Sequence, residues 1–234
     1  QFFMIPLIHN QMKNTYFKSL LFKHLMTFKK YSILRISQIE ALLDSNISGT
    51  ALDVGGKKTP NNISNYLKSK VTYLDKFASG ENDLKIDLEE KFSEENIAKV
   101  QFDNVLLMNV LEHIFNFKNC LKICYYFTKD GGKLFGSTPF LYRVHPSPND
   151  YFRYTEEALE KIISEAGYKN IVITPLVGGI FISFYSNIFL ASSKIPFLNN
   201  FMLPIILFLD NILFFFTKNY KKIMPIGYFF TATK

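Results

Sequence analysis

The sequence predicts a doubly wound α/β protein with a mostly parallel sheet of seven strands and helices on both faces. Two observations support this class. Short apolar runs alternate with helical segments between Thr50 and about Pro175. Most of these runs consist mainly of apolar residues, as strands do when both faces of a parallel sheet are covered. The 234 residues have the length of one domain, and 48% of them are hydrophobic, which is enough to fill a core.

The strands are expected at short apolar runs that end near glycine, asparagine or aspartate. They are residues 51–54, 71–74, 85–88, 103–108, 133–137, 171–173 and 227–232. Run 85–88 has the weakest pattern, because Lys85 and Asp87 alternate with its two apolar residues.

The helices are expected between these strands and before the first one. They are residues 36–44, 61–68, 94–99, 120–127 and 156–166. The helix at 156–166 is marked most clearly, because Thr155 can cap its N-terminus, Glu156 complements its dipole and Gly167 ends it.

Two segments depart from this alternation, which predicts three parts: an N-terminal helical cap at 1–48, a core at 49–175 and 225–234, and a hydrophobic helical insertion at 176–224. The apolar stretches of the insertion contain glycine, proline and asparagine, which disfavours a membrane span. Three lysines follow them, namely Lys218, Lys221 and Lys222. This pattern predicts contact with an anionic membrane surface. A dimer interface, a local lid and a true span stay open as alternatives.

The net charge of +7 is uneven, with six basic and no acidic residues from Lys13 to Arg35. Such a segment can attract nucleic acid or anionic lipid, or form a solvated helix face. Cys120 and Cys124 can build neither a disulfide scaffold nor a zinc site, and this favours a reducing compartment. We expect no metal site, because the histidines are scattered: His9, His24, His113 and His145. Without a signal-peptide pattern, the expected location is cytoplasmic, either free or peripheral on the inner face of the cell membrane.

Ligands of open parallel sheets bind beyond the carboxyl ends of the strands. Glycines or polar residues follow the predicted strands at that edge. They are Asp53, Gly55 and Gly56, then Asp75, Asp87, Asn109, Glu112 and His113, and finally Ser137 and Thr138.

These residues, with Phe102–Val105 and Gly131–Leu134, resemble the class I S-adenosylmethionine-dependent methyltransferases, whose fold is Rossmann-like. The resemblance covers roughly residues 35–175 and the last strand. The stretch from Thr138 to Thr155 is similar to the small "type 11" branch, which is often associated with bacterial surface-glycan pathways.

The resemblance implies S-adenosyl-L-methionine as the cofactor and a role for each matching residue. Asp53, Gly55 and Gly56 would border its methionine part, Asp75 would hold the ribose, Asp87 would contact the adenine, and Met108 and Asn109 would line the sulfonium end. One departure matters, because Lys57 and Thr59 stand where the second and third glycines of the usual loop belong. Unless Gly56 substitutes for one of them, cofactor binding is weakened or lost.

The acceptor is expected at the loop between the fifth strand and its helix, because long loops at this edge often carry function. We expect His145 to be the general base, with Asp150 orienting it or acting in its place. Arg153 is expected to clamp an anionic group of the acceptor, and Tyr151 to contact the acceptor.

The expected function is methyl transfer to a hydroxyl of a sugar or related small polar acceptor, which the membrane prediction allows to be lipid-linked. One alternative is a non-catalytic methyltransferase-like binding protein at a membrane surface. A nucleic-acid methyltransferase is disfavoured, since no Asn/Asp-Pro-Pro-Tyr motif follows the fourth strand. A homodimer is also an open alternative.

Overall fold

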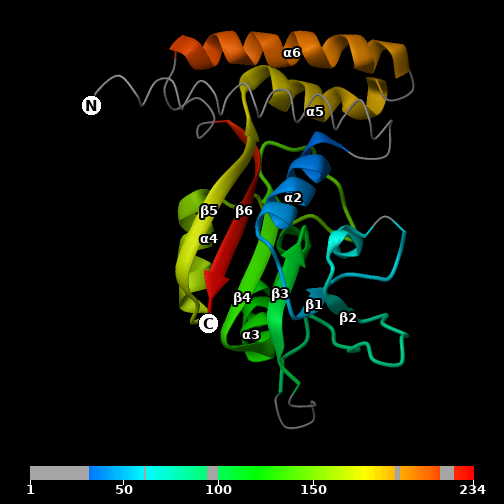
Figure 1. Cartoon of the computed structure of the whole chain (residues 1–234), viewed down its shortest axis with the longest axis vertical. Coiled ribbons are helices and arrows are strands. Elements are labelled where there is room, and N and C mark those ends of the chain that lie inside the picture. Colours follow the sequence, from blue (N-terminus) through cyan, green and yellow to red (C-terminus); the bar gives the residue numbers. More distant parts are fainter. Residues whose placement is uncertain (1–31, 61, 94–99, 193–195, 217–223) are drawn as a thin grey trace. The chain divides into compact units, whose positions relative to one another are not determined.

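The computed structural model describes residues 32–60, 62–93, 100–192, 196–216 and 224–234. One sheet of six strands runs in the order β2-β1-β3-β4-β6-β5 (Figure 1). The strands are β1 Thr50–Val54, β2 Lys70–Leu74, β3 Phe102–Met108, β4 Thr128–Pro139, β5 Lys169–Gly178 and β6 Pro225–Thr233. The helices are α2 Ile33–Asp44, α3 Phe117–Phe127, α4 Glu156–Glu165, α5 Ile180–Ser192 and α6 Pro196–Phe216, with 3-10 turns η1 Ile63–Tyr66 and η2 Leu111–His113.

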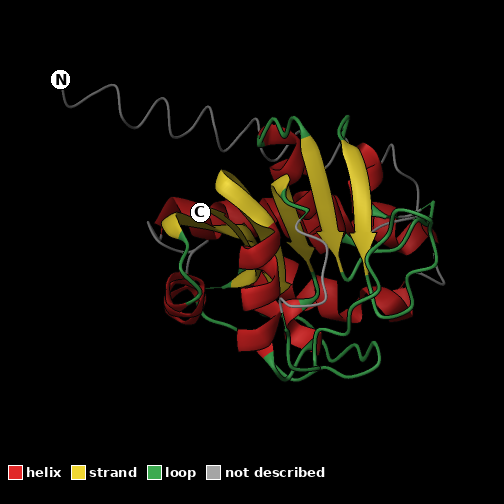
Figure 2. Cartoon of the chain, turned by 90° about the horizontal axis from the view of Figure 1, so that it is seen from below, coloured by secondary structure: helices red, strands yellow, loops and turns green. Residues whose placement is uncertain are grey.

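The strand pairing confirms the predicted class, in a mixed sheet. β1 pairs in parallel with β2 and β3, β3 pairs in parallel with β4, and β6 runs antiparallel to β4. Figure 2 distinguishes the strands from the helices that accompany them. The carboxyl ends of β1 to β4 therefore meet at one edge, where the site residues were expected.

The prediction of seven strands was wrong, because residues 85–88 do not form a strand. Leu84 makes only an isolated parallel bridge to Leu74. Beyond it, the carboxylate of Asp87 accepts a hydrogen bond of 3.0 Å from the backbone N–H of Glu89. This local turn competes with strand pairing, as aspartate side chains often do.

The alternating faces of the central strands separate two layers of the core. Leu52 and Val54 of β1 and Val105 and Leu107 of β3 share one apolar cluster with buried residues of α3 and α4. The intervening residues of both strands point to the opposite face, as the period of a strand requires. Thr155 caps α4 by accepting a hydrogen bond from the N–H of Ala158, which confirms the predicted helix start.

Two other helix predictions have different outcomes. The helix expected at 61–68 is only the 3-10 turn η1. The helix expected at 94–99 lies outside the described residues, as do His9, His24 and the lysines at 218, 221 and 222.

The chain divides into two compact units. The first comprises Gln38–Leu176 and Gly227–Lys234, and it contains nearly the whole sheet. The second comprises Gln1–Ser37 and Val177–Ile226. In the described part of the second unit, the buried carboxylate of Asp210 on α6 accepts hydrogen bonds from the backbone N–H groups of Phe181 and Ile182 at the start of α5. No helix among the described residues is long and apolar enough to cross a membrane.

Candidate functional site

The corner after β1 requires two residues without side chains. Gly55 has a φ of +72°, and a Cβ there would lie 2.7 Å from Cγ2 of Val110. A Cβ on Gly56 would lie 2.3 Å from the carboxyl carbon of Asp53. Both glycines are therefore needed for the close approach of this corner to its neighbours.

Asn62 holds the irregular loop that follows these glycines. Its side-chain amide donates to the carboxylate of Asp53 over 2.9 Å and to the backbone oxygen of Lys57 over 2.7 Å. Its side-chain oxygen accepts from the N–H of Ser64 and caps η1. The side chain of Asn62 thus holds the loop in which Lys57 and Thr59 stand at the glycine positions of the usual motif.

Asp75 lies beside this corner, directly after β2. The N–H of Gly55 donates to the carbonyl of Leu74 over 2.7 Å, which joins the two strand ends. Oδ1 of Asp75 accepts from the N–H of Phe77 over 2.8 Å, and Nζ of Lys57 lies 3.8 Å from it. The carboxylate retains 17% of its exposure, so part of it faces solvent.

An exposed aromatic ring accompanies this carboxylate. Phe77 is 68% exposed, and the ammonium groups of Lys57 and Lys76 lie 5.1 and 5.2 Å from its ring centre. Asp87 lies 3.8 Å from Lys76 and forms the turn described above, so its adenine contact stays a prediction.

Asn109 continues the same edge after β3 and has a left-handed backbone with φ of +56°. Its side chain exchanges two hydrogen bonds with Gln38 of α2, of 2.6 and 3.2 Å, and accepts one of 3.2 Å from Ser137. Met108 is 93% buried just before it. Asn109 thus links α2, β3 and β4 next to the glycine corner.

Arg153 and Asp150 stabilise the loop between β4 and α4, where the acceptor is expected. Nη1 and Nη2 of Arg153 bind the two carboxylate oxygens of Asp150 at 2.5 and 2.7 Å. The remaining guanidinium N–H groups donate to backbone carbonyls of Tyr142, Arg143 and Phe152. Because all five N–H groups are used, this arrangement does not leave Arg153 free to clamp an anionic acceptor, and its role is to hold the loop.

The loop brings together two histidines that are far apart in the sequence. The rings of His113 and His145 lie edge to face with centroids 5.0 Å apart. Nε2 of His113 and Nε2 of His145 lie 3.6 and 3.7 Å from the same Oε1 of Glu112. The expectation that the histidines are scattered was wrong for this pair, because the return of the loop to η2 places them side by side.

Charges around this cluster alter two proton affinities. The Glu112 carboxylate raises the pKa of His145 above its ordinary value, although partial burial of the ring acts in the opposite direction. The Arg153 guanidinium holds the pKa of Asp150 well below its usual range. Asp150 also accepts from the N–H of His145 over 2.8 Å. Asp150 is therefore suited to orient His145 and poorly suited to act as a base in its place.

Tyr151 follows Asp150 in this loop and is 44% exposed. Its backbone N–H donates to the carbonyl of Glu112 over 2.8 Å, and its ring packs edge to face against Phe115. The exposed ring remains available for an acceptor.

Sequence reasoning did not give roles to Gln38, Asn62 and Glu112. Asn62 precedes an apolar residue and a serine, which is the pattern of a helix cap, and could have been found by that signal. The pairing of Gln38 with Asn109 and that of Glu112 with His145 have no local signal, because tertiary packing creates both.

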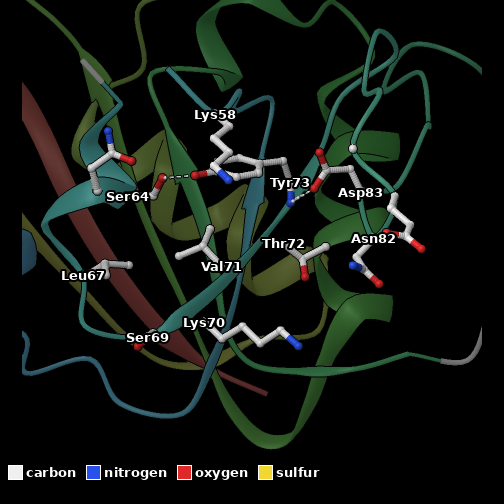
Figure 3. A pocket seen from close by; sticks show the side chains of 13 residues that line it. Lys58, Ser64, Leu67, Ser69, Lys70, Val71, Thr72, Tyr73, Asn82 and Asp83 are labelled. Atoms are coloured by element: carbon white, nitrogen blue, oxygen red, sulfur yellow. Dashed lines mark hydrogen bonds between the residues drawn. The ribbon is translucent and has the colours of Figure 1, made fainter. Parts of the chain in front are cut away.

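A polar cavity of about 420 Å³ lies along the outer edge of β2 and is lined partly by Ser64 of η1 (Figure 3). Lys70, Val71 and Thr72 form one wall, and Asn82 and Asp83 form part of another. The cavity does not include Asp53, Asp75 or the histidine cluster, so we do not assign the chemistry to it.

No protein-family model and no curated protein sequence matches the chain. Solved structures do. A SAM-dependent methyltransferase from Archaeoglobus fulgidus is 16% identical with a TM-score of 0.53, covering 91% of this chain and 99% of that chain.

Two further structures are similar. The 1,6-didemethyltoxoflavin-N1-methyltransferase of Burkholderia thailandensis, solved with S-adenosylhomocysteine, is 12% identical with a TM-score of 0.51, covering 95% of this chain and 87% of that chain. The [4+2]-cyclase SpnF is 14% identical with a TM-score of 0.51, covering 86% of this chain and 80% of that chain. At these identities the likeness establishes the fold, which is that of the class I S-adenosylmethionine-dependent methyltransferases.

Proposed function

We propose that this protein is an S-adenosylmethionine-dependent methyltransferase that acts on a hydroxyl of a sugar or related small polar acceptor. One observation carries the cofactor assignment. The glycine corner after β1 and the carboxylate of Asp75 after β2 are joined at one sheet edge by the hydrogen bond from Gly55 to Leu74. This is the edge at which open α/β sheets bind ligands.

The residues at this edge fit the cofactor chemically. The part-exposed carboxylate of Asp75 can accept hydrogen bonds from two neighbouring ribose hydroxyls. The exposed ring of Phe77 offers an apolar face to a purine. We place the methionine part along the backbone of Gly55 and Gly56, which carry no side chains to obstruct it, near Asp53. When bound, the cofactor supplies an electrophilic methyl group on a sulfonium.

The chain's own residues have to align the acceptor and remove its proton. We place this proton removal at the cluster of Glu112, His113 and His145. Its most exposed member is His145, whose side chain keeps 27% of its exposure, whereas the side chain of Asp150 keeps 2%. Tyr151 is the proposed contact for the acceptor's apolar ring face.

A sugar hydroxyl is the acceptor that the sequence favours, through the resemblance of residues 138–155 to the type 11 branch. The polar groups of the loop agree with this choice, since a hydroxyl needs both a proton acceptor and hydrogen-bonding partners. The test is transfer of a labelled methyl group from S-adenosylmethionine to sugar acceptors, free and lipid-linked.

His145→Asn should abolish this transfer and leave cofactor binding unchanged. Asp130→Asn, which alters a 97% exposed carboxylate far along the sheet, is the control and should retain full turnover. Equal turnover of His145→Asn and the unaltered protein would remove His145 from the mechanism. Labelling of amines but not of hydroxyls would overturn the acceptor class.

We also propose that the second unit contacts an anionic membrane surface. Four side chains spaced three or four residues apart on α6 are 41% to 76% exposed, namely Ile205, Phe208, Ile212 and Phe216. An apolar stripe of this kind suits an interfacial helix, and the sequence places lysines close after it. A lipid-linked acceptor would then lie in the same membrane that the enzyme binds.

Flotation with phosphatidylglycerol vesicles tests this surface. Phe208→Ser with Phe216→Ser should lose flotation, whereas Val172→Ser, which alters a 58% exposed side chain of β5, should retain it. Failure of the unaltered protein to float would overturn the membrane assignment. If the protein instead forms a concentration-dependent dimer that the double substitution dissociates, this surface is a dimer interface and not a membrane contact.

A non-catalytic binding protein is the second candidate, and the ion pair of Lys57 with Asp75 favours it. Lys57 stands at a usual glycine position and lies 3.8 Å from the carboxylate proposed for the ribose. The same fold also serves the cyclase SpnF, so the fold alone does not fix the reaction. Absence of cofactor binding by folded protein would favour this candidate.

A further inference from the structure

The carboxylate of Glu112 is completely buried, yet neither of its oxygens has a hydrogen-bond partner among the described residues. Burying a carboxylate without a partner is costly, so such a group normally pairs with a cation or binds a metal ion. The nearest groups are the Nε2 atoms of His113 and His145, at 3.6 and 3.7 Å from Oε1. These distances are too long for direct hydrogen bonds.

The three donor atoms are arranged as metal ligands are. One donor atom from each of Glu112, His113 and His145 lies within 4.8 Å of the other two. Metal–nitrogen and metal–oxygen bonds of about 2.0–2.2 Å place neighbouring ligands roughly 3 to 3.5 Å apart. A single ion between the three atoms therefore requires the cluster to contract, by only a little along the two distances to Oε1 of Glu112.

The other ring nitrogens are held in the way that ligating histidines usually are. Nδ1 of His113 lies 2.5 Å from the carbonyl oxygen of Asn149. It donates a hydrogen bond to this oxygen when the ring carries its proton on Nδ1. Nδ1 of His145 lies 3.2 Å from the carbonyl of Arg143 and 3.3 Å from Oδ2 of Asp150. Such outer contacts keep the proton on Nδ1, so that the lone pair of each Nε2 faces Glu112.

We propose that Glu112, His113 and His145 bind one divalent transition-metal ion. Two imidazoles and one carboxylate suit zinc best, and also suit cobalt or iron in the divalent state. Three protein ligands leave at least one coordination position open for a water molecule or a hydroxyl oxygen. The donor set disfavours magnesium and calcium, which prefer oxygen ligands.

The ion has a use at this position, and this part of the inference rests on the proposed methyl transfer. A hydroxyl bound at the open position would lose its proton more readily, because the positive charge stabilises the alkoxide. His145 would then act as a ligand, and the ion would take over the task of making the acceptor nucleophilic. The binding of the ion itself does not depend on methyl transfer.

The first test is titration of the metal-free full-length protein with Co²⁺, followed by visible absorption and by calorimetry with Zn²⁺. We expect one ion per chain, with visible bands of a low-symmetry nitrogen and oxygen site. Glu112→Gln and His145→Asn should each weaken binding by about 100-fold or more, since each removes a ligand. Asp150→Asn, which removes an outer contact of His145, should weaken it about tenfold.

Two controls distinguish loss of this metal site from unspecific metal binding and from unfolding of a variant. His24→Asn removes a histidine that is not one of the three proposed ligands, and this variant should bind the ion as the unaltered protein does. The melting temperature of each variant without metal identifies any that has unfolded, and His113→Asn, whose side chain keeps 11% of its exposure, is a second ligand variant if Glu112→Gln does not fold.

The proposal is overturned if the unaltered protein binds no Co²⁺ or Zn²⁺. It is also overturned if folded ligand variants bind these ions as tightly as the unaltered protein. Calorimetry with S-adenosylhomocysteine on the same samples tests the proposed function separately. Metal binding without cofactor binding would leave the ion site standing and remove its role in methyl transfer.

Discussion

The side-chain amide of Asn62 donates a 2.9 Å hydrogen bond to the buried carboxylate of Asp53. The same amide donates to the backbone of Lys57, so one side chain ties the loop after the glycine corner to the end of β1. In this way the chain can keep an ordered loop although Lys57 and Thr59 replace two glycines.

Asn62→Ala should weaken the binding of S-adenosylhomocysteine by about tenfold, because it leaves the Asp53 carboxylate without this donor and frees the loop. Calorimetric titration measures the change. Asn65→Ala is the matched control, since among the described residues its exposed amide donates to the carbonyl of Thr59. A change of less than twofold for Asn62→Ala would contradict the role of Asn62.

Gly55→Ala should lower the free energy of unfolding by about 3 kcal/mol. About 1 kcal/mol comes from the left-handed backbone and the rest from the clash with Val110. Gly131→Ala is the matched control, because Gly131 has a φ of +76° but no atom within 4 Å of an added Cβ. It should lose only about 1 kcal/mol in urea unfolding. Equal losses for both variants would show that the close approach of Val110 is unimportant.

Arg153→Lys should lower the free energy of unfolding by about 3 kcal/mol, although it keeps the charge. A lysine cannot reproduce the two-pronged contact with Asp150 and the bonds to three carbonyls. Arg143→Lys in the same loop is the comparison and should cost less, since Nη1 of Arg143 has no hydrogen-bond partner in the described part of the chain. An unchanged stability of Arg153→Lys would indicate that Arg153 is available for an acceptor after all.

Asp150 should make the protein acid-sensitive. Its pKa is lower in the folded than in the unfolded chain, because Arg153 stabilises the carboxylate. The stabilisation is therefore fully present above the unfolded value of about 4 and is lost as the pH falls toward the folded value. Urea unfolding of Asp150→Asn at a series of acidic pH values should show a flatter decline than the unaltered protein. Parallel declines would contradict this account.

The strands and the cofactor edge were predictable because they depend on local pattern. The apolar run 105–108 is buried on both faces of its strand, and Thr155 carries a capping signal in its own neighbourhood. The order of the parallel strands then brings Asp53 and Asp75 to one edge without knowledge of any side-chain contact.

The remaining features depend on competition between contacts that the sequence does not reveal. At 61–68, the bonds of Asn62 to Asp53 and Lys57 favour a single 3-10 turn over a longer helix. At 85–88, the turn formed by Asp87 ends the pairing begun at Leu84. Arg153 was expected to clamp an anionic group of the acceptor, but its donors bind Asp150 and three backbone carbonyls of the loop.

The most direct test of the central claim is calorimetric titration of the full-length protein with S-adenosylmethionine and S-adenosylhomocysteine. We expect micromolar binding of both, lost in Asp75→Asn and retained in Asp130→Asn, because Asp75 lies beside the glycine corner and Asp130 does not. No binding by a folded, monodisperse sample would contradict the account. It would favour the non-catalytic binding protein instead.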